Sequence, residues 1–126
     1  MLVIASSKNN LKPGFNVVFK NESFKCAFIT YSEAYSDKTV KEMKRHNTTD
    51  EIFILLKGEA SIFIYEEGKK AEKIHMKKHK AYNITKNTWH HVTVSHDAEL
   101  FVIENSNCSS ENTEALYLSN ENCLIE

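Results

Sequence analysis

His46, Glu51 and His90 have the residue types and the spacing to share a metal ion. Four residues separate His46 from Glu51, which begins an apolar run, and His90 begins a later run of β-branched residues. Imidazole and carboxylate ligands together accept iron, manganese, zinc or nickel, and leave positions open for a substrate or oxygen. We therefore predict a divalent transition metal on these three side chains and no organic cofactor. No Ser/His/Asp set, glycine-rich phosphate loop or CxxC pair competes with them.

Strand alternation predicts that Glu51 faces the protein interior. Every second side chain of a strand lies on the same face, so Glu51 shares its face with Phe53 and Leu55, which we expect in the core. The alternative is that Glu51 only caps its strand at the boundary with water. The metal-ligand interpretation depends on the joint pattern of this carboxylate and the two histidines.

The same alternation distinguishes two adjacent histidines. His90 shares its face with Val92 and Val94, whereas His91 lies on the other face. We predict that His90 points inward, where it is either a ligand or a hydrogen-bonded core residue. Three further histidines are expected at the surface: His75, His79 and His96.

The elements that must position these residues are predicted to be strands. Runs rich in aromatic and β-branched residues occupy segments 15–19, 24–31, 51–74, 79–85, 89–95 and 99–105. Segment 51–74 contains two runs that meet at Lys57-Gly58. The spacing of the later segments, roughly 8–12 residues, is typical of a sandwich or barrel. Because no stretch shows helical periodicity, the predicted fold class is all-β.

Length and composition suit one globular domain. The 126 residues are 41% hydrophobic and 26% charged, with a formal charge of −1. We predict a single domain over residues 1–126, with its core at about 15–105, an N-terminal arm over 1–14 and a C-terminal segment over 106–126. The sequence leaves open whether the C-terminal segment is a last edge strand or a loose arm.

Charge and hydropathy indicate which partners to expect. The basic stretch 69–80 fits an exposed edge hairpin better than a nucleic-acid surface, and no apolar stretch approaches the roughly 20 residues of a membrane helix. With no leader, and with three cysteines that form no disulfide pattern, the chain is expected in the cytoplasm, without nucleic-acid or membrane partners. The apolar segments 1–5 and 115–118 could pair across a two-fold axis, so we predict a homodimer.

Two short stretches resemble the motifs of the cupin superfamily. The first cupin motif runs Gly…His-x-His, three or four residues, Glu, six residues, Gly. His46, Glu51 and Gly58 match its second histidine, its glutamate and its last glycine. The second motif is Pro-x-Gly-x-x-His, and the stretch TKNTWH keeps its spacing, with Asn87 in place of glycine and His90 as the histidine.

This resemblance, over roughly residues 40–105, implies a single cupin-like double-stranded β-helix (jelly-roll) barrel. The family includes isomerases, epimerases, lyases and dioxygenases that act on sugars, small acids or related metabolites. Other members bind small molecules or regulate transcription without catalysis, and many keep the fold after losing the metal. The resemblance therefore implies a small-molecule ligand, a sugar or a carboxylic acid. It leaves open a metalloenzyme, a metal-free binding or sensing protein, and a relic whose role is assembly.

The chain departs from the first motif at Lys44, which stands where the family has its first histidine. The usual four ligands are thereby reduced to three. Lys44 could pair with Glu51 in a metal-free site, or hold an anionic group of a ligand when a metal occupies Glu51. Tyr82 and Trp89 are further candidates for the wall of a ligand-binding cavity, with core packing as their alternative role.

Overall fold

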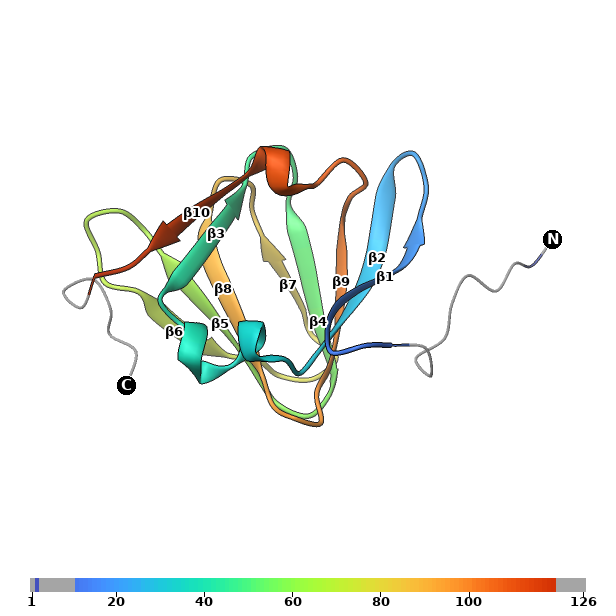
Figure 1. Cartoon of the computed structure of the whole chain (residues 1–126), viewed down its shortest axis with the longest axis horizontal. Helices are drawn as coiled ribbons and strands as arrows, with labels where there is room; N and C mark the ends of the chain where they lie inside the picture. The colour runs from blue at the N-terminus through green and yellow to red at the C-terminus, as the bar shows by residue number, and fades with distance from the viewer. Residues whose placement is uncertain (1, 3–10, 120–126) are drawn as a thin grey trace.

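Two five-stranded β-sheets face each other in the computed structural model, which describes Leu2 and residues 11–119 (Figure 1). From edge to edge, the first sheet contains β1 (Gly14–Lys20), β2 (Phe24–Thr30), β9 (Glu99–Asn105), β4 (Glu51–Lys57) and β7 (Ala81–Ile84). The second contains β10 (Thr113–Tyr117), β3 (Glu42–His46), β8 (Trp89–Val94), β5 (Ala60–Tyr65) and β6 (Glu72–His75). Short 3₁₀ turns occupy η2 (Glu33–Tyr35), η3 (Asp37–Thr39) and η4 (Ser110–Asn112).

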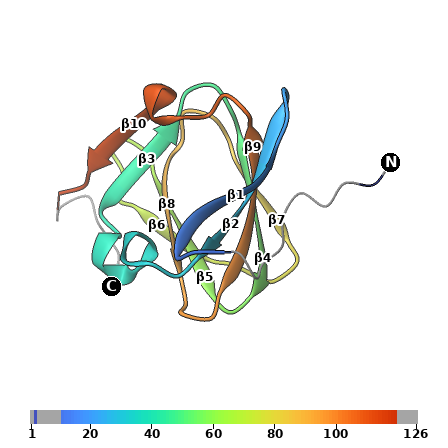
Figure 2. The same cartoon turned by 45° about the vertical axis from the view of Figure 1, so that its right-hand side comes forward.

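From β3 onward the chain crosses repeatedly between the two sheets. Strands β4, β7 and β9 lie in the first sheet, and the strands between and around them, β3, β5, β6, β8 and β10, lie in the second. All pairs of named strands are antiparallel. Figure 2 shows the resulting barrel-like enclosure. No named strand of one sheet pairs with one of the other within residues 11–119, so the barrel is not closed. The predicted all-β jelly-roll fold is confirmed.

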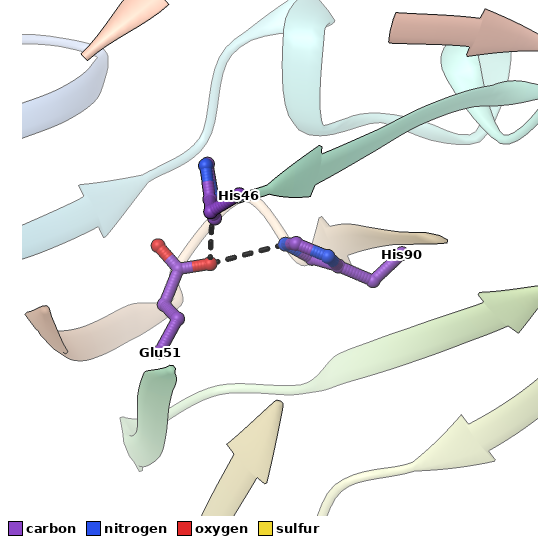
Figure 3. Close-up of side chains that lie close together, drawn as sticks. All are labelled: His46, Glu51 and His90. Atoms are coloured by element: carbon purple, nitrogen blue, oxygen red, sulfur yellow. Dashed lines mark hydrogen bonds and ion pairs between the residues drawn. The ribbon is translucent and has the colours of Figure 1, made fainter. Parts of the chain in front are cut away.

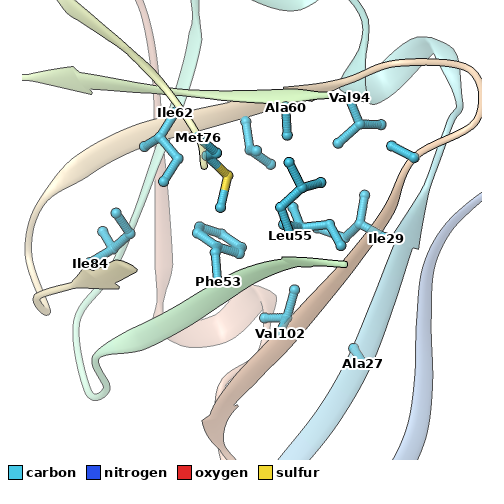
Figure 4. Packing of buried hydrophobic residues seen from close by; sticks show 13 residues of the cluster. Ala27, Ile29, Phe53, Leu55, Ala60, Ile62, Met76, Ile84, Val94 and Val102 are labelled. Atoms are coloured by element: carbon cyan, nitrogen blue, oxygen red, sulfur yellow. The ribbon is translucent and has the colours of Figure 1, made fainter. Parts of the chain in front are cut away.

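The main core lies between the sheets, where 13 buried apolar side chains pack together (Figure 4). They occupy alternate positions, because alternate side chains of each strand face the same side. Two rows of directly opposed residues cross three strands of the first sheet: Ala27, Val102 and Phe53, and then Ile29, Leu100 and Leu55. Burial of each large side chain in these rows stabilises the fold by roughly 1.5–3 kcal/mol.

Two turn positions require a left-handed backbone. Gly58 has φ +77°, and a Cβ there would lie 2.7 Å from the Cα of Ala98, so only glycine fits. Asn87 has φ 66°, and asparagine tolerates this conformation better than most residues. Asn87 therefore serves where the second cupin motif has glycine.

The ends of the chain extend the barrel only in part. The C-terminal segment supplies an edge strand, β10, which pairs with β3 along its full length. In the segment predicted to support a dimer, Tyr117 is 70% exposed. Residues 1, 3–10 and 120–126 lie outside the described part of the chain, as does most of the N-terminal arm, and the homodimer stays a prediction.

The lysine-rich hairpin has the position that its composition predicts. Strand β6 lies at the edge of the second sheet, and all four of its residues are exposed. Lysines at such an edge disfavour pairing with another chain. None of the helical elements in the described residues is long and apolar enough to cross a membrane.

Candidate metal centre

A row of polar side chains replaces the apolar rows at one end of the interior. Register places Lys25 opposite Glu104, and Glu104 opposite Glu51. His46, at the end of β3, and His90, on β8, reach the same space from the second sheet. All five residues line a cavity of about 480 Å³, a size that suits a small metabolite.

Glu51 lies between the two histidines (Figure 3). Its Oε1 is 3.0 Å from Nε2 of His90 and 3.4 Å from Nε2 of His46. One ligand atom from each of the three residues falls within 4.8 Å of the others. Glu51 and His90 are only 5% and 6% exposed, so the predicted inward orientation of both residues is confirmed.

The second ring nitrogen of His90 determines where its proton lies. Nδ1 is 2.9 Å from the backbone carbonyl oxygen of Thr88. A carbonyl oxygen can only accept, so Nδ1 of His90 donates and carries the hydrogen. Nε2 of a neutral His90 therefore presents its lone pair to Glu51.

His46 is oriented in the same way by a hydroxyl group. Its Nδ1 is 2.8 Å from Oγ1 of Thr113, and that hydroxyl donates its one hydrogen to the backbone carbonyl of Ser109 at 2.7 Å. Thr113 must then accept from Nδ1–H of His46. Nε2 of a neutral His46 is left, like that of His90, with a lone pair facing the carboxylate of Glu51.

Two imidazole lone pairs and a carboxylate oxygen thus converge. They repel one another unless a positive charge lies among them. Added protons satisfy the requirement, and so does a cation. Ligand atoms at neighbouring positions around an ion with bonds of about 2.1 Å are separated by roughly 3.0–3.4 Å. The two N···O distances, 3.0 and 3.4 Å, fall in this range. Histidine ligands held through Nδ1–H by carbonyl or hydroxyl oxygens are the usual surroundings of protein metal sites, so the residues fit a transition metal.

The electrostatics of the group favour an ionised Glu51. Burial opposes ionisation, but hydrogen bonds with His46 and His90 outweigh burial and hold the pKa of Glu51 well below its usual value. Burial also lowers the pKa of His46, but its hydrogen bond to Glu51 and the negative charge there raise it overall. The carboxylate is therefore present as an anion for either a metal or two protonated imidazoles.

Glu104 is a member of this group that the sequence analysis missed. It is 6% exposed, and its Oε2 lies 3.5 Å from Nζ of Lys25. Burial, together with a hydrogen bond to Glu51 and the charge of that residue, raises the pKa of Glu104 to about 7. A proton on Glu104 would be shared with Glu51, which allows two carboxyl groups to lie side by side. The alternation of Leu100, Val102 and Glu104 was the signal that could have revealed it.

Cys108 completes the buried wall beside these carboxyl groups. Its Sγ is 3.3 Å from Nδ1 of His46, and its backbone oxygen accepts a hydrogen bond of 2.6 Å from Lys25. Burial and the neighbouring Glu104 raise the pKa of the Cys108 thiol to about 12. The thiol is therefore neutral and is not a ready metal ligand in this position.

Lys44 lies at the cavity but does not make the ion pair that was expected for a metal-free site. It is directly opposite His90 in the pairing of β3 with β8 and lines the cavity, yet it is exposed. Among the described residues, Glu51 is hydrogen-bonded to the two histidines and to Glu104 instead. The motif position is thus occupied by a lysine near the site but outside its hydrogen-bond network.

Tyr82 and Trp89 do not line this cavity. Both are packing residues, which was the alternative role for them. The Tyr82 side chain packs against the main core, and its hydroxyl accepts a hydrogen bond of 2.9 Å from the backbone of Lys77. Trp89 packs on the other face of the second sheet, with the guanidinium of Arg45 4.4 Å from its ring centroid. Tyr82 faces inward at the height of Phe53, below the polar row.

The other histidines also lie where the sequence predicts. His91 is turned toward Oγ1 of Thr39, at 3.1 Å, and burial lowers its pKa to about 4. Its ring lies beside Phe63, outside the group of three. Three exposed histidines occupy the predicted surface positions: His75, His79 and His96.

The sequence matches no protein-family model and no curated protein. Solved structures match it in fold. A cupin-2 domain protein from Shewanella frigidimarina, at 18% identity, aligns with a TM-score of 0.56 over 76% of this chain and 83% of its own. The chain has a cupin-like fold.

Two enzymes share the cupin-like fold at lower identity. Bacillus subtilis oxalate decarboxylase aligns at 14% identity with a TM-score of 0.58, over 75% of this chain but only 24% of its own. A substituted form of Streptomyces Pac13, a nucleoside dehydratase, solved with uridine, aligns at 8% identity with a TM-score of 0.62, over 83% and 79%. At such identities the likeness extends to the fold alone, so the chemistry must be argued from the cavity.

Proposed function

We propose that this cupin-like chain holds a divalent transition metal on His46, Glu51 and His90, and that the cavity binds or transforms a small polar metabolite there. The observation that carries the proposal is the shared orientation of the two imidazoles. Each has its Nδ1–H committed to an oxygen, so each presents Nε2 to the same carboxylate oxygen. A bound ion would act as a Lewis acid toward a ligand oxygen.

The residues around the group have roles that do not depend on the identity of the metal. Thr88 and Thr113 hold the imidazole rings in one tautomer. Glu104 shares a hydrogen bond with Glu51 and keeps that carboxylate in place. With about 480 Å³ beside the three ligands, the cavity leaves room for a ligand next to the ion. These features support a site prepared for binding, whether or not a reaction follows.

Metal analysis of the purified protein tests the proposal. We expect about one transition-metal ion per chain, lost on treatment with a chelator and regained when zinc, manganese, iron(II) or nickel is added. Restoring an ion at 100 times its Kd should stabilise the fold by roughly 2.7 kcal/mol, measured as a rise in thermal midpoint. A protein that takes up no ion and shows no change in midpoint would contradict the proposal.

The second candidate function is a metal-free binding or sensing protein, favoured by one observation. The hydrogen bonds of Glu51 to His46 and His90 are complete without an ion once the imidazoles carry extra protons, and the pKa of His46 is raised accordingly. A group with a raised pKa stabilises the fold below its unfolded pKa, and that contribution is lost as pH rises through the folded pKa. In the metal-free case, untreated protein should therefore lose stability as pH rises above about 6.5, and a chelator should change nothing.

A further inference from the structure

The Lys44 side chain reaches the cavity from the strand beside His90. The two residues are directly opposite each other in the antiparallel pair β3–β8, so their side chains leave the same face of the sheet with Cβ atoms about 5 Å apart. His90 directs its ring at Glu51, and Lys44 lines the wall of the same cavity. A flexible lysine at this position can reach the open side of the His46–Glu51–His90 group.

The ammonium group of Lys44 has no anionic partner within ion-pair distance among the described residues. Neighbouring cations do have partners: Lys25 lies 3.5 Å from Glu104, and Arg45 lies 2.8 Å from Glu114. The charge of Lys44 is nonetheless close enough to add, after burial, to the lowering of the pKa of His91. A cation thus stands at the cavity without a counter-ion from Leu2 or residues 11–119.

The charge balance of the occupied cavity favours an anion. Its wall contains three carboxylates, Glu42, Glu51 and Glu104, and two lysines, Lys25 and Lys44. A divalent ion together with the two lysines outweighs the three carboxylates even when all three are ionised. The small excess of positive charge matches a carboxylate, which carries one negative charge, better than a phosphate dianion.

We propose that Lys44 forms an anion subsite and that the ligand of this cavity is a small carboxylate-bearing metabolite. Its carboxylate pairs with the ammonium of Lys44 while another of its oxygens faces the metal. This inference rests on the proposed function, because without the ion the carboxylate of Glu51 would repel such a ligand. At the position where the cupin motif has a histidine that binds the metal, Lys44 would instead bind the carboxylate of the metabolite.

Binding of a matched pair of probes to metal-loaded protein tests the subsite. 3-Hydroxypropionate and 3-hydroxypropanamide have the same length and the same hydroxyl group, but only 3-hydroxypropionate is charged, with one negative charge. We expect zinc-loaded wild type to bind 3-hydroxypropionate, measured by calorimetry, and to bind 3-hydroxypropanamide at least tenfold more weakly. Because a charge-assisted hydrogen bond is lost, Lys44→Met should weaken 3-hydroxypropionate binding roughly 10- to 100-fold. Lys44→Arg should retain most of the affinity, and Lys70→Met, at an exposed position between β5 and β6, serves as the control variant.

Metal content, measured on every variant, separates the two proposals. Unchanged zinc content with weakened 3-hydroxypropionate binding in Lys44→Met supports the subsite. Unchanged zinc content with wild-type 3-hydroxypropionate affinity in Lys44→Met overturns the subsite and leaves the metal proposal standing. A wild type that holds no metal overturns both. Tighter binding of inorganic phosphate than of 3-hydroxypropionate would overturn the assignment of the ligand as a carboxylate.

Discussion

The two ends of the barrel interior are built by the same strands but are held together by different forces. Along each of three strands the inward face changes from polar to apolar: Glu51 to Phe53 and Leu55, Glu104 to Val102 and Leu100, and His90 to Val92 and Val94. At the apolar end stability depends on the volume that is packed. At the polar end each group depends on particular partners, and removal of one leaves the others unsatisfied. The comparison indicates that stability can be altered at the apolar end without changing the groups that would bind a metal.

The largest effect should come from the apolar end. Phe53 is 2% exposed and lies at the centre of a row, so Phe53→Ala should lower the free energy of unfolding by about 3–5 kcal/mol, measured by urea denaturation. Metal content per folded chain should change little. Phe24→Ala, at a side chain that is 40% exposed, is the matched control and should cost far less. Similar losses from both variants would contradict the described packing.

At the polar end we expect loss of metal binding, the property that Phe53→Ala should leave nearly unchanged. His90→Ala removes a proposed ligand, so zinc affinity should fall by roughly 100-fold or more, beyond the 10- to 100-fold typical of supporting residues. His91→Ala should leave affinity within a few-fold of wild type, because the His91 side chain is directed at Thr39. Titration with zinc under competition by a chelator measures both. Equal losses would mean that His91 takes part in the site.

The smallest effect should be a change in how stability depends on pH. Since the pKa of Glu104 is raised from 4.5 to about 7, the folded state holds a proton that the unfolded state has released, and stability falls as pH rises through that window. Glu104→Gln cannot ionise and keeps a hydrogen-bond donor beside Glu51. Relative to wild type, this variant should gain about 1–3 kcal/mol between pH 5 and pH 8.

Urea unfolding of chelator-treated protein at both pH values provides the measurement. Chelator treatment is needed because an ion on Glu51 would alter the charge that raises the pKa of Glu104. A difference between variant and wild type that does not change with pH would show that Glu104 is ionised throughout.

Alternation along strands was enough to predict the orientation of the three central residues. Glu51 and His90 each share a face with neighbouring core residues in the sequence, and this local pattern survives folding. Alternation gives the face of a side chain but not its height along the barrel. Tyr82 was therefore assigned to the cavity although it faces inward in the row of Phe53. Trp89 precedes His90 directly, and the same rule would have excluded it.

The contacts that orient the histidines could not be predicted from the sequence. Thr113 meets His46 because β10 pairs with β3, and nothing near either residue in the sequence specifies that pairing. Glu104 joins Glu51 through the register of β9 with β4, which depends on the whole sheet. Such contacts follow from strand order, whereas sequence patterns report only local periodicity.

The hydrogen bonds of Glu51 cross from one sheet to the other, since β4 belongs to the first sheet and β3 and β8 to the second. These hydrogen bonds hold the two sheets together at one rim of the open barrel, whereas apolar packing holds them together at the opposite end. Separating the sheets at the polar rim breaks a few hydrogen bonds of Glu51, whereas separating them at the packed end disrupts the apolar core and unfolds the protein. We therefore expect the sheets to separate more readily at this polar rim, beside the cavity, than at the packed end.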